Sequence, residues 1–225
     1  MTDRLALAAA FWACFAGPLL AGAWPREPGG VFLSQRFDYD RSWREQKASA
    51  TLYAEYGLSR RLTVVGQLSN EDEPWTVSRS ALGLNYALGR LDAPDKVAVS
   101  LGVSTPPTMM GVTTERRIEA GLHWGRGFES RWGGGWATAS AKLLFARDED
   151  DPITDFSALV GLRPKDRWMA MLSASRYGDT QGTYVKVSPS VGYELRDRLW
   201  VVPSVTLELT DDRSTGVGVS FWFSF

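Results

Sequence analysis

The chain contains one histidine, His123, and this residue decides whether the sequence could encode a hydrolase. A serine nucleophile needs a histidine to take up its proton, and it needs a third group that orients the ring. The surrounding segment GLHWG contains no serine beside His123 or one residue away on the same face, although a serine on a neighbouring strand remains conceivable. The pattern favours a polar wall residue over a barrel-embedded lipid hydrolase. We therefore do not expect an enzyme.

Two further segments hold side chains that could bind a ligand, but their spacing does not fit a cofactor site. The acidic run DEDD, Asp148–Asp151, lacks the spaced Asp and Gly pattern of a calcium loop. The segment GRGFES, Gly125–Ser130, lacks the lysine and the spacing of a phosphate-binding loop. We expect no metal and no cofactor. The acidic run would be solvated, or bridged through divalent ions to phosphates of lipopolysaccharide.

The first 23 residues are typical of a secretory signal. A single cation, Arg4, precedes an apolar run over Leu5–Ala16 and a small-residue end, Ala21-Gly22-Ala23. The run is shorter than the roughly 20 residues that a membrane-spanning helix needs. Cleavage before Trp24 would also remove Cys14, the one cysteine, and with it any disulfide or thiolate zinc site. We predict a signal peptide over 1–23 and one domain over 24–225.

The composition excludes some classes of partner. The net charge is −1, and 23% of the residues are charged, without a strongly basic or acidic half. Nucleic acid is therefore not an expected partner. No apolar stretch after Trp24 could cross a bilayer as a helix, so a membrane-embedded form of this chain would have to be a barrel.

Apolar residues alternate with small or polar residues in segments of about ten residues throughout the domain. Clear examples are Leu82–Leu88, Val97–Val103 and the final stretch GVGVSFWFSF, Gly216–Phe225. The repeats predict an all-β fold, a transmembrane antiparallel up-and-down β-barrel of about twelve strands. The facing of Trp168–Tyr177 stays open, because its outer residues could be Ala170, Leu172 and Ala174 or Met169 and Met171.

The connections between these segments alternate in length and charge. Short turns on one rim and longer loops on the other are typical of outer-membrane barrels, in which the short rim faces the periplasm. Two connections, Gly89–Lys96 and Gly125–Gly135, fall on the short side but are predicted to be long. The short basic connections are Gly57–Arg61, Arg163–Arg167 and Arg196–Arg198, and the acidic ones are Ser69–Trp75, Ala146–Pro152 and Thr210–Ser214.

A soluble β-sandwich is the main alternative, because the inner faces of two stacked sheets would show the same alternation. The signal peptide, the even strand count and the alternating connections favour the membrane barrel and a location in the outer membrane, in contact with its lipid and lipopolysaccharide. Aromatic residues near strand ends would form a belt at the membrane interface. They are Tyr56, Tyr86, Trp124, Trp168, Tyr193 and Trp200.

The final strand needs a partner on each side, and a closed barrel supplies one by pairing it with the first strand. We therefore expect both termini on the periplasmic side. A C-terminal Phe225 after alternating apolar residues also resembles the signal that barrel-assembly machinery recognises.

One hairpin carries a family resemblance. The stretch SATLYAEYGLSRRLTVVGQL, Ser49–Leu68, resembles the second hairpin of the phenol-degradation meta-pathway family of outer-membrane transporters, in which YxEYGLTDRLTL recurs. The start near Ala23-Trp24 and the pair Gly29-Gly30 are similar too, whereas Ser59-Arg60 replaces the usual Thr-Asp. The resemblance implies a barrel in the outer membrane more firmly than it implies a cargo.

If the apolar stripes face lipid, the residues between them line the lumen. The lumen could be a narrow channel or transporter for small polar or aromatic-acid solutes, biased toward anions by its cations. Alternatively, these cations pair with carboxylates and close the barrel, which would then have a structural or surface-interaction role. The charged and titratable residues predicted to line the lumen are Arg36, Asp38, Lys47, Glu55, Arg79, Arg117, Glu119, His123, Lys142, Asp155, Arg163, Lys186, Glu194 and Glu208.

Overall fold

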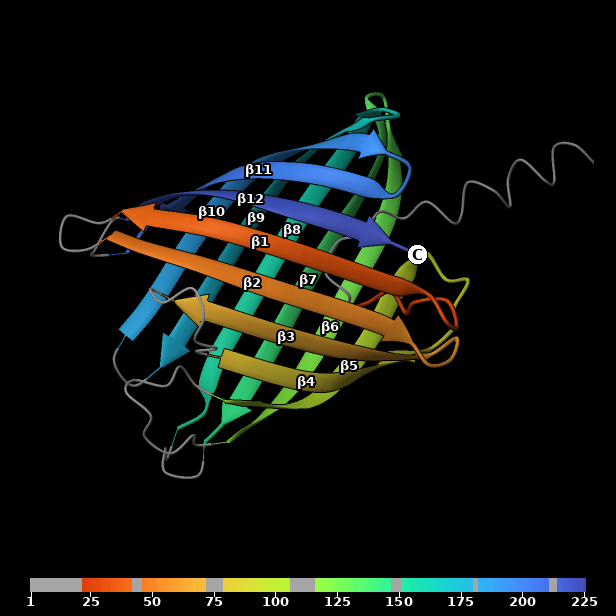
Figure 1. Ribbon diagram of the computed structural model, residues 1–225. Coiled ribbons are helices and arrows are strands. Elements are labelled where there is room, and N and C mark those ends of the chain that lie inside the picture. The colour runs from red at the N-terminus through yellow and green to blue at the C-terminus, as the bar shows by residue number, and fades with distance from the viewer. Residues whose placement is uncertain are drawn as a thin grey trace, which may run out of the picture.

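The computed structural model describes residues 22–41, 46–71, 79–105, 116–146, 151–179, 182–210 and 214–225. These residues form one closed barrel of twelve strands (Figure 1), which confirms the predicted fold class. Most of the predicted signal peptide, residues 1–21, lies outside the described residues. The strands are β1 Val31–Arg41, β2 Gln46–Gly57, β3 Leu62–Glu71, β4 Arg79–Leu88, β5 Asp95–Thr105, β6 Arg117–Ser130, β7 Gly133–Phe145, β8 Ile153–Lys165, β9 Trp168–Asp179, β10 Gly182–Arg196, β11 Leu199–Glu208 and β12 Thr215–Ser224.

Closure comes from the pairing of the last strand with the first. Strand β12 runs antiparallel to β1, from the pair Phe32 and Ser224 to the pair Arg41 and Thr215. Beyond the strand end, the backbone N–H of Phe225 donates to the carbonyl of Val31 at 2.9 Å. Figure 1 shows the two strands side by side, with the C-terminus at the rim where β1 begins. Both sides of β12 are thus paired, so the barrel has no open edge there.

The barrel has two rims that differ in their connections. We call the rim with Phe225 and the turns after β2, β4, β6, β8 and β10 the turn rim, and the opposite one the loop rim. The acidic connections predicted at the loop rim fall largely on residues 72–78, 147–150 and 211–213, which lie outside the described residues. None of the described residues forms a helix with the length and apolarity that a bilayer crossing requires.

The predicted apolar stripes lie on the outside of the barrel. Leu101 exposes 64% of its surface and Leu82 60%, while the residues between the stripes turn inward because side chains alternate along a strand. The alternative of two stacked sheets is wrong, because a single closed sheet leaves these side chains uncovered. A continuous apolar outer surface of this kind is rare in soluble monomers.

Strand β9 settles which residues of Trp168–Tyr177 face outward, the point that the sequence left open. Met169 and Met171 are buried inside the barrel, and Trp168 and Leu172 are exposed outside it. The alternative with Ala170, Leu172 and Ala174 on the outer face is therefore the correct one.

The predicted long connection at Gly125–Gly135 is wrong. Strands β6 and β7 continue through this segment, and only Arg131 and Trp132 remain as the tip of the hairpin. The hydroxyl of Ser130 donates to the carbonyl of Gly133 at 2.8 Å, and Gly133 has a φ of 112°, which favours glycine. The other predicted exception, Gly89–Lys96, remains a real turn, although β5 already begins at Asp95.

The predicted aromatic belt is present on the outer surface with one exception. Tyr56, Tyr86 and Trp124 are exposed near the turn rim, and the Trp168 ring lies 4.8 Å from that of Tyr193. Trp200 is the exception, because it points into the barrel and is 4% exposed.

Candidate functional site in the barrel lumen

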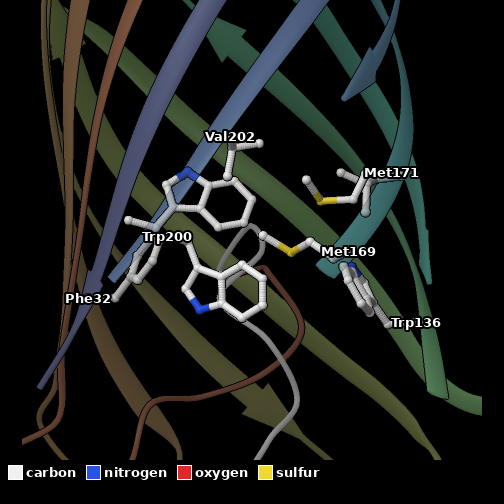
Figure 2. Packing of buried hydrophobic residues seen from close by; sticks show 8 residues of the cluster. Phe32, Trp136, Met169, Met171, Trp200 and Val202 are labelled. Carbon is white, nitrogen blue, oxygen red and sulfur yellow. The ribbon is translucent and has the colours of Figure 1, made fainter. Parts of the chain in front are cut away.

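Apolar side chains fill the lumen near the turn rim (Figure 2). The buried residues of this group, which we call the apolar cluster, extend inward from several strands toward the axis of the barrel. The Phe32 ring meets the rings of Trp222 and Tyr53 edge-on, with centroids 6.4 and 6.3 Å apart. The cluster consists of Phe32, Trp136, Leu159, Met169, Met171, Trp200, Val202 and Trp222.

The apolar cluster differs from the prediction, which was an inner wall of polar side chains. Trp200, Val202 and Trp222 break the polar half of the alternation in β11 and β12. The signal in the sequence is the presence of apolar residues on both faces of a strand. Strand β9 shows the same signal, which is why its facing stayed open.

We call the segment before β1, Gly22–Gly30, the N-terminal segment. Its first residues lie inside the barrel, whereas Glu27, Pro28 and Gly29 are exposed. Gly22 and Ala23 precede the predicted cleavage site, so the mature segment would begin at Trp24. Trp24 packs against the apolar cluster, and a side chain at Gly125 would overlap the Trp24 ring. Ala23 is buried, with 2% of its surface exposed. A Cβ at Gly22 would lie 2.6 Å from Nδ1 of His123, so this part of the segment lies directly against that ring.

Arg26 fastens the N-terminal segment to the wall of the barrel. Its guanidinium forms an ion pair with Glu55, whose side chain is completely buried, and lies 4.7 Å from the centroid of the Phe32 ring. The backbone N–H of Arg26 donates to Oγ1 of Thr63 at 3.0 Å. Trp24 and Arg26 therefore both contact the apolar cluster. Sequence reasoning assigned no role to Arg26, and a cation just before the first strand was its only signal.

A second anchor of the N-terminal segment is made by backbone groups. The N–H of Gly29 donates to the carbonyl of Gly57 at 2.8 Å, and the N–H of Gly57 donates to the carbonyl of Gly30 at 3.0 Å. Any side chain at Gly57 would collide with the carbonyl oxygen of Glu27. The hairpin that carries the family resemblance thus holds the segment through a glycine that nothing larger can replace.

A cavity of about 270 Å³ remains in the lumen beside the N-terminal segment. Its volume corresponds to about nine water molecules at roughly 30 Å³ each. Gly22, Ala23 and His123 line one part of it, and the uncharged polar side chains of the surrounding wall line another. We call it the lumen cavity; its uncharged polar wall residues are Tyr53, Gln67, Asn85, Ser100, Thr138, Ser140 and Ser157.

Four charged side chains also line the lumen cavity, all from the loop-rim halves of their strands. Arg79 and Glu119 form an ion pair of 3.3 Å. Lys142 lies opposite Asp155 in the register of β7 and β8. Asp155 is within electrostatic reach of Arg79 and Glu119 as well, so the four charges form one group.

All of the residues predicted to line the lumen share the inner face of their strands, but they do not form one site. Arg36 pairs with Asp38 at 2.5 Å and donates to the hydroxyl of Ser204 at 3.2 Å. The hydroxyl of Ser214 donates to Glu208 at 2.6 Å near the loop rim. Lys186 stands opposite Glu208 in the register of β10 and β11.

The remaining charged residues lie closer to a rim. Lys47 stands opposite Asp40 at the loop-rim end of β1 and β2, and it is exposed. Arg163 places its guanidinium 5.0 Å from the Trp200 ring. Glu194 accepts a hydrogen bond from the backbone N–H of Arg198 at the turn rim. Arg117 begins β6, opposite Ser104 in the register with β5.

His123 is buried and contacts a serine on the neighbouring strand. Its Nε2 lies 2.9 Å from Oγ of Ser100, which is the cross-strand contact that the sequence left conceivable. Ser100 is the hydrogen-bond partner of His123 among the described residues, and Nδ1 faces the backbone of Gly22. The pair therefore lacks the orienting carboxylate of a triad within the described part of the chain. The described residues also contain no group of three or more His, Cys, Asp or Glu that could hold a metal ion.

Comparison with protein-family models and with curated proteins finds no match. Among solved structures, the chain is similar to the KdgM porin in complex with disordered oligogalacturonate, with a TM-score of 0.64 and 8% identity over 86% of this chain and 99% of that one. The NanC porin has a TM-score of 0.63 and 9% identity, over 85% of this chain and 98% of that one. An outer membrane channel from Pseudomonas putida F1 has a TM-score of 0.61 and 10% identity, over 93% of this chain and 100% of that one. At these identities the likeness shows a shared barrel fold.

Proposed function

We propose that this chain is an outer-membrane β-barrel that acts as a narrow channel for small polar solutes. The observation that carries the proposal is the lumen cavity, a space of about 270 Å³ with polar and charged side chains in its wall, inside a closed barrel with an apolar outer surface. The shared fold with porins and channels of the outer membrane supports it. Charged side chains within a membrane-spanning body are tolerated where they meet water or opposite charge, as the four charges of the cavity would.

The N-terminal segment and the apolar cluster make this channel narrow and closed at rest. Hydrophobic constrictions in pores block ions by excluding water, and the cluster is such a constriction. Passage along the lumen requires the segment to shift toward the turn rim, because Trp24 and Arg26 occupy the space that a solute would cross. We therefore expect brief openings rather than a steady current.

A closed barrel with a structural or surface-interaction role is the competing function. Two observations favour it. Arg36 and Arg79 form ion pairs with Asp38 and Glu119, which are pairs of the kind that the second sequence-based hypothesis expected. The apolar cluster, which that hypothesis did not include, adds buried side chains to the lumen. Aromatic-acid solutes, the other predicted solute class, stay a prediction. Lipopolysaccharide and the barrel-assembly machinery, the partners predicted in the envelope, are compatible with both functions and do not distinguish them.

Uptake of an uncharged solute by liposomes separates the two functions. Liposomes with the refolded barrel should swell in iso-osmotic erythritol faster than empty liposomes, and Trp24→Ala should swell faster still, because the variant loosens the N-terminal segment. Trp132→Ala is the matched control, since Trp132 lies exposed at the tip of the β6–β7 hairpin. Equal swelling of empty, wild-type and Trp24→Ala liposomes would contradict the channel and favour the closed barrel.

A further inference from the structure

The four charges of the lumen cavity alternate in sign around the wall. In strand order they are Arg79 on β4, Glu119 on β6, Lys142 on β7 and Asp155 on β8. Each cation therefore has a carboxylate beside it, through the Arg79–Glu119 ion pair and the register of Lys142 with Asp155. The group carries no net charge when all four side chains are ionised.

A row of alternating charges on one side of the wall discriminates against solutes that carry one sign of charge. An anion that approaches Lys142 also meets the carboxylates of Asp155 and Glu119 within the same small space, and a cation meets Arg79 and Lys142. Such juxtaposition of like charges disfavours the wrong ligand. A solute that carries both charges can contact a cation and a carboxylate of the cavity at the same time. Its two charges then take the place of the ion-pair partners that it separates, so no charge is left uncompensated.

The rest of the cavity wall suits the uncharged part of such a solute. Gln67 and Asn85 offer amide donors and acceptors, and Ser140 and Ser157 offer hydroxyls that already contact each other at 2.7 Å. The inner positions Gly83 and Gly102 stand opposite each other in β4 and β5, and they leave room beside the charges. A volume of about 270 Å³ admits only a small molecule.

We infer that the lumen cavity is a selectivity site for small zwitterions, molecules that carry an ammonium and an acidic group on a short carbon skeleton. In this site the acidic group contacts Arg79 or Lys142, and the ammonium contacts Glu119 or Asp155. This inference rests on the proposed function and specifies its solute class. It replaces the anion preference that the cations alone predicted, because the cavity holds as many carboxylates as cations.

Two probes of nearly equal size and shape test the inference. Taurine carries a sulfonate and an ammonium, and isethionate carries the same sulfonate with a hydroxyl in place of the ammonium. In proteoliposomes of the full chain, we expect the uptake rate of taurine to exceed that of isethionate at least threefold. The double variant Glu119→Gln/Asp155→Asn should reverse this ratio, because the cavity then carries two uncompensated cations.

A matched control removes two carboxylates outside the lumen. Asp92→Asn/Asp166→Asn changes the net charge by the same amount in exposed turns at the turn rim, and it should keep the wild-type ratio. Uptake of erythritol, measured in parallel, reports passage itself. If erythritol is taken up and the uptake rate of isethionate equals or exceeds that of taurine, the inference is overturned, whereas the proposed channel function is not. Absence of uptake for erythritol and both probes would overturn the channel, and the inference with it.

Discussion

Single residues in the lumen show which contacts hold the barrel closed and which are left unsatisfied. In the ion pair of Arg26 with Glu55 the carboxylate is completely buried, and removal of the partner of such a buried charge typically costs about 3–5 kcal/mol because the charge stays behind. Trp136 is the opposite case: within the described residues, its buried Nε1 has no hydrogen-bond partner.

Trp136 therefore permits a clear prediction about stability. Trp136→Phe should leave the thermal unfolding temperature unchanged or raise it, because the variant keeps most of the ring and removes a buried donor that costs about 1–3 kcal/mol when unsatisfied. Trp136→Ala should lower stability by about 3–5 kcal/mol, because it leaves a cavity in the apolar cluster. Heat-modifiable gel migration measures both. A marked loss of stability for Trp136→Phe, close to that for Trp136→Ala, would contradict the absence of a partner for Nε1.

The charged lumen residues illustrate what the sequence could predict at this scale. Alternation placed Arg79, Glu119 and Asp155 on the inner face, because side chains in a strand have a period of two. It could not place Arg26 beside Glu55, because Arg26 precedes the first strand and belongs to no periodic pattern. Contacts that join a strand to an irregular segment depend on three-dimensional packing.

At the scale of the strands, the periodic pattern predicted the elements well and their ends less well. The hairpin of β6 and β7 was mistaken for a long loop because glycines at 125, 127 and 133–135 suggested a loop. In the barrel, two of these glycines, Gly125 and Gly135, make room for aromatic rings instead. A Cβ at Gly135 would lie 2.5 Å from the Phe128 ring.

Gly161 of β8 provides a test of this packing role. Gly161→Ala should destabilise the barrel by about 1–3 kcal/mol, because the new methyl group would overlap the Trp136 ring. Gly66→Ala is the matched control, since a Cβ at this strand position meets no atom within 4 Å. Urea unfolding followed by tryptophan fluorescence measures both variants. Equal stability of the two would contradict the assigned packing.

The whole molecule combines an outer surface suited to lipid with a lumen that is half apolar and half polar. The sequence predicted closure, strand number and the outer surface, because these depend on regular alternation. It did not predict that the lumen is divided, because Met169, Met171 and Trp200 were assigned to either face or to the outer belt. Their burial depends on which strand positions converge at the turn rim, and one strand alone does not show this.

Assembly in the cell is a property of the whole chain that Phe225 can test. The side chain of Phe225 is 68% exposed, while its backbone pairs with Val31. Phe225→Ala should therefore refold in detergent as wild type does but accumulate less in the outer membrane, if the barrel-assembly machinery reads this side chain. Cell fractionation and refolding yield measure the two effects. Unchanged membrane levels would contradict this partner.

The claim on which the account depends is that the N-terminal segment closes a continuous passage through the barrel. Planar-bilayer recordings of wild type and Glu55→Gln test it most directly, because the substitution keeps the shape of the side chain and removes the charge that holds Arg26. We predict small, brief openings for wild type and larger, longer openings for Glu55→Gln. A current no different from that of lipid alone for both proteins, with folding verified by heat-modifiable migration, would contradict the account.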